Sequence, residues 1–185
     1  MIADVVKDAE TRMTKAVESL QHHLSTVRTG RASPSLVDRI VVEYYGTPTP
    51  LNQMANISVP ESRLLVIQPY DKGVIGAIEK ALQRSDLGLN PNNDGQVIRI
   101  GIPPLTEERR KQLVKLVHQY VEEGKVAVRN VRRDAQGDIK SLLAEKMISE
   151  DDETRGHKQI DDLTRKYADE MDRIGKSKEH EVLEV

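Results

Sequence analysis

Residues 103–142 read PPLTEERRKQLVKLVHQYVEEGKVAVRNVRRDAQGDIKSL and contain the strongest structural pattern in the chain. Apolar residues recur there in steps of three and four, which is the spacing of one face of an α-helix. The seam consists of Leu113, Val117, Tyr120, Gly124, Val128, Val131, Ala135, Ile139 and Leu142. Thr106 is a candidate N-cap, and two glutamates follow it in the first turn, where carboxylates favour the helix dipole. The pattern predicts one helix from Glu107 to Met147, roughly 60 Å long.

Two other segments of the chain show the same helical spacing. Residues 2–27 place apolar side chains on one stripe, with Leu24 beside it, and the pattern stops where Gly30 and Pro34 oppose continuation. That stripe consists of Val6, Ala9, Met13, Ala16, Leu20 and Val27. After a capping-box-like start at Ser149, the spacing continues through Ile160, Leu163, Tyr167, Met171 and Ile174. Amphipathic helices bury their stripes against one another, so three of them with short connections predict an antiparallel three-helix bundle.

The segment between the first two helices has a different pattern. Short β-rich runs replace the helical spacing, with one short helix at Gly76–Arg84 and turn-like sequences at Gly46–Pro50 and Asp86–Pro91. The β-rich runs are Val37–Tyr45, Ile57–Val59, Leu64–Gln68 and Val97–Ile100. The fold class is therefore predicted as α+β, an elongated antiparallel three-helix bundle with an inserted small β/α/β head.

This insertion sets the expected domain boundaries. The bundle is predicted to comprise residues 1–29 and 106–185, and the head residues 30–105, with hinges near 29–32 and 103–105. The hinge residues are Arg28, Thr29, Gly30, Arg31, Pro103, Pro104 and Leu105. The two linkers are compatible with a stiff rod that carries the head on a limited hinge, and equally with a head packed rigidly on the bundle.

Composition excludes several classes of protein. The chain has 185 residues, of which 31% are charged and 37% hydrophobic, and this balance fits neither a disordered nor a membrane protein. It contains no cysteine, which removes disulfides and thiolate chemistry. Charges interrupt the first residues, so they do not form a signal peptide, and no stretch is apolar enough to span a membrane. We expect a cytoplasmic, monomeric protein without membrane contact.

Basic side chains gather on one arc of the predicted long helix. Projected down the axis, six of them lie well away from the apolar seam, with Arg110 and Lys115 at the borders of the arc. The six are Lys111, Lys125, Arg129, Arg132, Arg133 and Lys140. From Lys125 to Arg133 there are four cations and no carboxylate, so this run forgoes the i,i+4 pairing of an ordinary solvated face.

We interpret this run as an edge that binds RNA. The planar guanidinium group of arginine suits phosphate oxygens, and a chain without Trp or Phe has few rings to stack on bases. The expected mode is therefore recognition of structured RNA by shape and backbone. The alternatives are a solubility stripe or local pairing with Asp134 and Asp138.

Neither a catalytic site nor a metal site is predicted. His22 and His23 lie about 100° apart on a helix and cannot easily share a metal, and the other histidines have no partner at ligand spacing. The acidic run Glu150–Glu153 is explained by a helix start, and neither GxxxxGK nor GxGxxG occurs. We predict a non-enzymatic protein with no cofactor. Tyr44 and Tyr45 are expected to place one ring in the core and one at the surface.

Several long motifs resemble those of ribosome recycling factor of bacteria and organelles, and the match covers essentially the whole chain. They are RTGRASP at 28–34, VEYYGTPTPL at 42–51, SDLGLNP at 85–91, PPLTEERRK at 103–111 and RNVRRD at 129–134. The resemblance implies an L-shaped protein with a three-helix bundle and a β/α/β head, bound between the ribosomal subunits after peptide release. Together with elongation factor G, which hydrolyses GTP, such a protein splits the post-termination complex and releases the ribosome from mRNA.

The resemblance also assigns residues by position. Arg110, Arg129 and Arg132 match arginines that such factors use on large-subunit ribosomal RNA, Arg133 lies beside them, and the head would face elongation factor G. The rival function is a coiled-coil adaptor whose head binds a protein and whose basic surface has no RNA role. Four glycines inside the predicted helices depart from ideal helix sequence, each at a cost of about 1 kcal/mol, and bring the straightness of the rod into question. They are Gly124, Gly137, Gly156 and Gly175.

Overall fold

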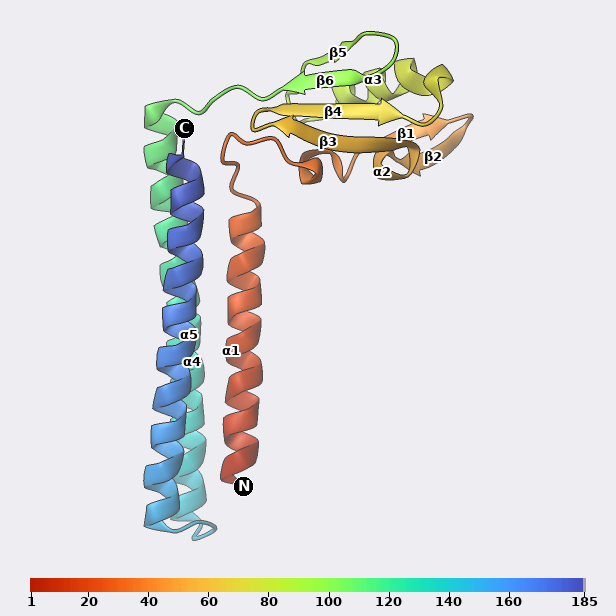
Figure 1. Ribbon diagram of the computed structural model, residues 1–185. Coiled ribbons are helices and arrows are strands. Elements are labelled where there is room, and N and C mark those ends of the chain that lie inside the picture. The colour runs from red at the N-terminus through yellow and green to blue at the C-terminus, as the bar shows by residue number, and fades with distance from the viewer. Residues whose placement is uncertain (185) are drawn as a thin grey trace. The chain divides into compact units, whose positions relative to one another are not determined.

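The protein, described here over residues 1–184 of a computed structural model, consists of two compact units (Figure 1). One unit contains Met1–Arg28 and the chain from Thr106 onward, and the other contains Thr29–Leu105. The first is a bundle of three long helices, and the second, inserted between the first two helices, is built on a β-sheet. The predicted α+β class, a three-helix bundle with an inserted sheet domain, is confirmed. Within the described residues, no helix is both long and apolar enough to cross a membrane.

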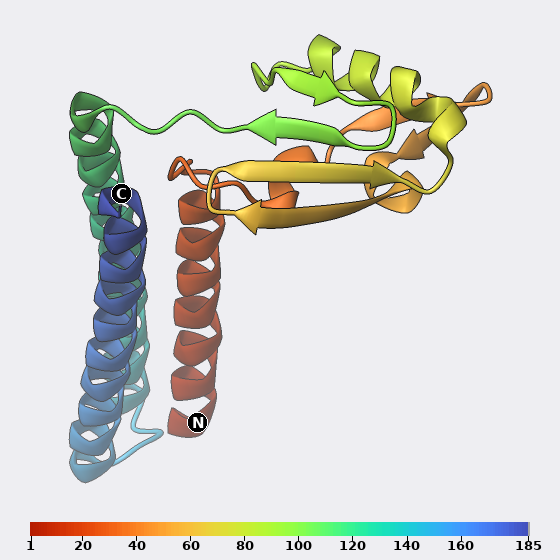
Figure 2. The same ribbon diagram turned by 45° about the horizontal axis from the view of Figure 1, so that its top comes forward.

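The bundle consists of α1 (Ile2–Ser25), α4 (Glu107–Ala144) and α5 (Glu150–Leu183). Figures 1 and 2 both show the three helices side by side, with α4 running antiparallel to the other two. Each contributes one apolar stripe to a shared core, which is what the three-four spacing predicts. Fully buried side chains in this core include Met13, Leu20, Ile139, Ile160 and Met171.

The observed stripes differ from the predicted ones at a few positions. In α1, Val17 and Leu24 are buried while Ala16 is only half-buried, so the larger side chains occupy the centre of the interface. In α5, Gly175 is buried in place of the half-buried Ile174. A periodic pattern defines an arc of the helix, and packing against the neighbours decides which residues of that arc lie deepest.

Three of the four helix-interior glycines mark close helix packing. A Cβ at Gly175 would lie 2.5 Å from Val121 Cγ2, one at Gly124 would lie 3.0 Å from Met171 Sδ, and one at Gly156 would lie 3.1 Å from Ile139 Cδ1. Only Gly137 faces open space. Both long helices continue without a break through these positions.

Side chains form hydrogen bonds at the starts of α4 and α5 and at the end of α1. Thr106 accepts a hydrogen bond from the Arg109 backbone N–H, and Ser149 forms the predicted capping box with Asp152. α1 ends at Ser25, five residues before Gly30, because the Ser25 and Thr26 hydroxyls donate to the carbonyls of the preceding turn, each at 2.6 Å.

The predicted end of α4 at Met147 is three residues too late. Lys146 adopts a left-handed conformation with φ of 57°, and its N–H donates to the Leu143 carbonyl at 2.9 Å. The Met147 N–H donates to the Leu142 carbonyl, also at 2.9 Å. These two bonds form a Schellman motif with lysine at the position that glycine usually occupies. Sequence rules that look for glycine therefore miss this helix end.

The head contains two sheets and several short helices. Strands β1 (Val41–Tyr44) and β2 (Thr47–Pro50) form a hairpin, and a second sheet has the antiparallel order β3-β4-β6-β5. The bounds of the second sheet are β3 Ala55–Glu61, β4 Leu64–Pro69, β5 Pro91–Asn93 and β6 Ile98–Gly101. The helical elements are η1 Pro34–Val37, α2 Leu51–Met54, η2 Lys72–Val74 and α3 Ile75–Arg84.

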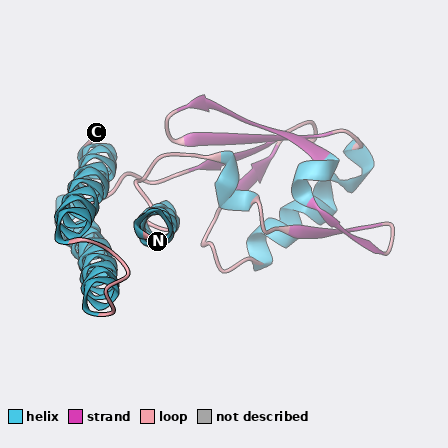
Figure 3. Cartoon of the chain, turned by 90° about the horizontal axis from the view of Figure 1, so that it is seen from below, coloured by secondary structure: helices cyan, strands magenta, loops and turns pink. Residues whose placement is uncertain are grey.

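The core of the head lies between the four-stranded sheet and its helices. Figure 3 shows the helices of the head on one side of that sheet. Leu65 and Ile67 of β4 and Ile98 of β6 are fully buried in one cluster with Ile78 and Leu82 of α3. The alternation along these strands leaves the other side of the sheet more exposed, as is usual for an antiparallel sheet.

The turn predicted at Gly46–Pro50 contains a strand, and the turn predicted at Asp86–Pro91 ends on the first residue of another. Thr47–Pro50 forms β2, and Pro91 opens β5. Both are edge strands, which need only half of their backbone groups for the sheet and therefore tolerate proline. The run from Val37 begins as a 3₁₀ turn, and the strand starts only at Val41.

Candidate RNA-binding surface

The predicted RNA-binding cations all lie on α4. Arg129, Arg132 and Arg133 are exposed, whereas Arg110 and Lys125 are partly buried. From Arg110 to Arg133 the helix advances about 35 Å, at 1.5 Å per residue. The five side chains therefore offer an extended edge and not a pocket.

Polar pairs cross from α4 to α5 at regular intervals. The distance is 3.0 Å from His118 Nε2 to Glu179 Oε2 and 2.5 Å from Lys125 Nζ to Asp172 Oδ1. A third pair joins Arg132 Nε to Asp161 Oδ1 at 2.8 Å. The α4 members recur every seven residues, which is two helical turns, so they follow one side of the helix. These pairs help to define the register of α4 against α5.

The run from Lys125 to Arg133 has no i,i+4 partner, as predicted, but three of its cations find carboxylates further away. The local sequence around Lys125–Arg133 contains no carboxylate, but α5 supplies two of them across the helix interface. Arg129 finds a third at Glu122, two turns earlier on α4, with 2.6 Å between Nη2 and Oε1. Asp134, one of the alternative partners considered, pairs instead with Arg12 of α1 at 2.9 Å. The sequence signal that was missed is the acidic residues of α5, Asp172 and Asp161, which lie opposite Lys125 and Arg132 when the two helices pack antiparallel.

Arg133 differs from its neighbours because its hydrogen-bond partner is neutral. Its guanidinium donates to the Asn130 side-chain oxygen, one turn earlier on the helix, and forms no ion pair within residues 1–184. It therefore keeps its full positive charge uncompensated at short range. Of the predicted cations, Arg133 has the most freely available charge for a phosphate.

The ion pairs of Arg129 and Arg132 are weak enough to exchange. Their side chains are 55% and 44% exposed, and exposed pairs contribute about 0–1 kcal/mol. When a phosphate replaces the carboxylate, the released carboxylate stays in water, so the exchange costs little. Lys125 is only 24% exposed in its pair with Asp172, and it acts mainly as a bridge between helices.

Arg110 lies in the first turn of α4. Its backbone N–H donates to the Thr106 carbonyl at 3.0 Å, and Thr106 also caps the helix through its side chain. The position of Arg110 is thus set by the N-cap, whereas the other four cations lie four turns or more further along the helix.

The predicted hinge residues lie in two chain segments without regular structure. Gly30 has φ of 77°, and a Cβ there would lie 3.1 Å from Leu105 Cγ, so the two segments touch. Ala32 N–H donates to the Ser62 carbonyl and Ile102 N–H to the Arg63 carbonyl, both at 2.8 Å. Backbone hydrogen bonds therefore tie each segment to the β3–β4 turn of the head, just beyond residues 28–31 and 103–105.

Groups with shifted pKa values lie at turns and caps. Backbone N–H groups of Val97 and Gln96 lower the pKa of Asp94 to about 2, and the Ser149 N–H lowers the pKa of Asp152. Backbone donors stabilise the charged form of a carboxylate, so these shifts are accounted for by local structure. They do not indicate an acid–base pair for catalysis.

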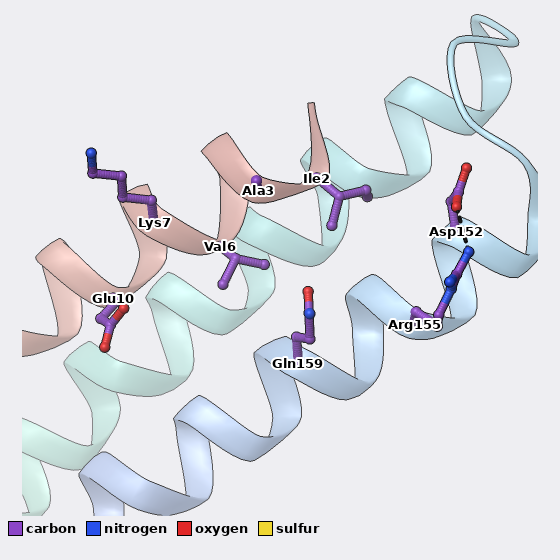
Figure 4. A pocket seen from close by; sticks show the side chains of 8 residues that line it. All are labelled: Ile2, Ala3, Val6, Lys7, Glu10, Asp152, Arg155 and Gln159. Atoms are coloured by element: carbon purple, nitrogen blue, oxygen red, sulfur yellow. Dashed lines mark hydrogen bonds and ion pairs between the residues drawn. The ribbon is translucent and has the colours of Figure 1, made fainter.

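One groove of about 550 Å³ lies in the bundle between the first turns of α1 and α5 (Figure 4). Its only arginine, Arg155, bonds Asp152 of the same helix at 2.8 Å, and the wall opposite is formed by Ile2 and Val6. Within residues 1–184, no three histidine or acidic side chains converge as metal ligands. The groove presents no nucleophile next to a base, and we assign no chemistry to it.

Comparison with known proteins gives one family over nearly the whole chain. A family model described as ribosome recycling factor matches residues 20–183. The ribosome-recycling factors of Thermomicrobium roseum and Chloroflexus aurantiacus are similar to this chain at 58% and 59% identity over 185 residues, covering 100% of both partners in each comparison.

Solved structures agree with this similarity. The solution structure of the ribosome recycling factor matches with a TM-score of 0.77 at 46% identity, covering 100% of this chain and 98% of that one. A second match has a TM-score of 0.64 at 45% identity and covers 99% of both chains. It belongs to models of the T. thermophilus ribosome recycling factor and the E. coli elongation factor G bound to the E. coli post-termination complex.

Proposed function

The chain belongs to the ribosome recycling factor family, and we propose that it splits bacterial ribosomes after termination, together with elongation factor G. The observation that carries this function is identity of 58% over 185 residues to a ribosome-recycling factor, covering 100% of both chains. The protein acts in the cytoplasm as a non-enzymatic translation factor, by binding and by mechanical transmission.

The bundle holds the ribosome through large-subunit RNA. Arg129, Arg132 and Arg133 supply exposed guanidinium groups along one edge of α4, with the partly buried Arg110 and Lys125 as further contacts nearer the start of the helix. Arg133 offers a charge that no carboxylate compensates, whereas Arg129 and Arg132 exchange carboxylates for phosphates. Each phosphate contact releases counterions, so the affinity decreases as salt increases.

The head receives force from elongation factor G. In this proposal residues 1–29 and 106–185 act as the rod and residues 30–105 as the head, with hinges at 29–32 and 103–105. The support is local: the chain at both hinges lacks helix and strand, and backbone hydrogen bonds from Ala32 and Ile102 to the head flank them. Such segments change conformation at lower cost than the helices they join.

The test is the splitting of post-termination ribosomes, followed by light scattering in the presence of elongation factor G and GTP. Replacement of both Arg132 and Arg133 by glutamate should slow splitting at least tenfold at limiting protein concentration, since it replaces two attractions by two repulsions. The matched control is Lys15→Glu with Lys158→Glu, two exposed lysines on the other helices that form no ion pair within residues 1–184. Equal rates for the two double variants would refute RNA docking through α4 and favour the adaptor.

A separate experiment addresses the hinges. Insertion of three residues between Gly30 and Arg31 should leave ribosome binding within about twofold and slow splitting at least fivefold, because a longer linker transmits less torque. Insertion of the same residues in the turn at Gly95, an exposed loop of the head, is the control. Unchanged splitting by the hinge variant would show that force does not pass through this segment.

A further inference from the structure

The head contains a cleft that is lined mainly by positively charged side chains. It has a volume of about 590 Å³ and lies between β1 and α3. Three cations line it, Arg39 before β1 and Lys80 and Arg84 on α3, against the single carboxylate of Glu43. Three positive charges and one negative charge leave +2 at this cleft, in a chain whose formal net charge is −2.

The cations of this cleft have no side-chain partner in the part of the chain that the structure describes. Within residues 1–184, Arg39, Lys80, Arg84 and Glu43 form no hydrogen bond or ion pair through their side chains, and all four are exposed. On α4, by contrast, Lys125 and Arg132 pair with carboxylates of α5. An excess of unpaired positive charge around a cleft is the electrostatic complement of an acidic ligand.

The folding of the head explains why these side chains converge. Lys80 and Arg84 are four residues apart on α3 and therefore lie on one face, away from the buried Ile78 and Leu82. Arg84 lies in the last turn, where the helix dipole stabilises a cation. The carboxyl end of α3 thus holds positive charge without needing a carboxylate from the chain itself.

The wall of the cleft between the cations is apolar. Val41 is 55% exposed at the start of β1, and Ala77 and Ala81 continue the surface on α3. An exposed valine beside two alanines offers an apolar contact in the middle of a charged rim. The cleft therefore suits a ligand that carries carboxylates around at least one apolar side chain.

These features favour a protein ligand over a nucleic acid. The five tyrosines all lie outside the cleft, so no aromatic ring there can stack on a base. A phosphate backbone would also make no favourable contact with the apolar wall of the cleft. We propose that the cleft between β1 and α3 binds an acidic segment of a partner protein, with an apolar side chain of that segment seated on Val41, Ala77 and Ala81. This rests on the proposed function in taking the head as the unit that meets a protein partner.

Glu43 restricts how an acidic segment can be oriented in the cleft. It lies on the same side of β1 as Val41, two residues along the strand, and would repel an acidic segment. The ligand must therefore place its carboxylates toward Lys80 and Arg84. Removal of this charge in Glu43→Gln should strengthen binding about two- to threefold, whereas most surface changes weaken or do not affect it.

The test uses the full chain and a fluorescein-labelled peptide of sequence Glu-Asp-Leu-Glu-Glu-Leu, followed by fluorescence anisotropy. Lys80→Glu with Arg84→Glu should weaken binding at least tenfold. The matched control, Arg63→Glu with Lys72→Glu, changes the net charge equally at exposed positions elsewhere on the head and should change binding less than twofold. A second peptide with serine in place of both leucines should bind at least fivefold more weakly to the unmodified chain.

Three outcomes would overturn the proposal. Equal loss of peptide binding in the two double variants would show a nonspecific charge effect, and equal binding of the serine peptide would remove the apolar contact. A ten-residue oligouridylate that binds more tightly than the peptide, and loses binding in Lys80→Glu with Arg84→Glu, would identify a phosphate site instead. Failure of the proposed function is distinguishable, because it appears as absence of ribosome splitting by the unmodified chain, whatever the peptide does.

Discussion

Gly175 of α5 offers the sharpest test of how the bundle is packed. An alanine Cβ there would lie 2.5 Å from Val121 Cγ2 on α4, about 1 Å closer than carbon atoms normally approach. Valine in a helix has one strongly preferred rotamer, so Val121 cannot turn its methyl group away at low cost. The two helices must therefore separate, or a strained rotamer must form.

The magnitude follows from two opposing effects. Replacement of glycine by alanine inside a helix gains about 1 kcal/mol, and forced overpacking of a core costs roughly 1–3 kcal/mol. We expect Gly175→Ala to lower the free energy of unfolding by about 1 kcal/mol net. At this chain length that corresponds to a decrease of about 2–4 °C in melting temperature.

Gly137 and Gly124 provide graded controls in the same bundle. A Cβ at Gly137 meets no atom within 4 Å, so Gly137→Ala should raise the stability by about 1 kcal/mol. A Cβ at Gly124 would lie 3.0 Å from Met171 Sδ, the end of a flexible side chain, and Gly124→Ala should fall between the two.

The assay is urea unfolding followed by far-ultraviolet circular dichroism, which reports mainly the long helices. Val121→Ala combined with Gly175→Ala should recover most of the loss, because it removes the methyl group that the new Cβ meets. The reasoning is refuted if Gly175→Ala is as stable as Gly137→Ala, or if the double variant shows no coupling beyond the sum of the single changes.

Three other predictions follow from named contacts. Arg133→Ala should reduce the slope of log affinity for large ribosomal subunits against log salt by about 1, and Lys125→Ala by clearly less, because Lys125 is occupied by Asp172; equal slopes in binding titrations would contradict this ranking. Backbone N–H groups hold the pKa of Asp94 at about 2, below its unfolded value, so its contribution is present above about pH 4 and is lost as the pH falls through about 2. Urea midpoints of Asp94→Asn and the unmodified chain should therefore differ near neutral pH and converge in acid, and a constant difference would be inconsistent with this linkage. The hydroxyl of Tyr45 donates to Asp71 at 3.0 Å, which raises the pKa of Tyr45, so its stabilising contribution is present below about pH 10 and is lost as the pH rises through the folded value. Ultraviolet titration of Asp71→Asn should show one phenol ionising at lower pH than in the unmodified chain, and an unchanged curve would argue against the hydrogen bond.

The two tyrosines of the hairpin show which features a local sequence pattern predicts and which it does not. Alternation along a strand predicts one ring inside and one outside, and Tyr44 is half-buried while Tyr45 is 74% exposed. Alternation does not predict that Tyr45 has φ of 48°, or that Asp71 accepts from both hydroxyls. Asp71 is more than twenty residues away along the chain, and only the fold brings it to the hairpin.

The same limit applies to the basic run on α4. Helical projection places Arg129, Arg132 and Arg133 away from the core, and all three are exposed in the structure. The ion pairs of Lys125 and Arg132 could not be predicted, since their partners Asp172 and Asp161 lie on α5 and meet α4 only through the antiparallel register. A count of charges in one segment therefore overestimates its free charge when a neighbouring helix has the opposite sign.

Helix periodicity, capping residues and the change of pattern after residue 30 were sufficient to predict three helices, an inserted β domain and the fold class, because these signals depend on neighbours within a turn or two of the chain. The tertiary structure alone decided which cations are paired, which glycines are closely packed and where three unpaired cations surround an apolar floor. Each of these depends on two segments far apart in sequence. Their relative position is set by the packing of the whole unit, which no local pattern contains.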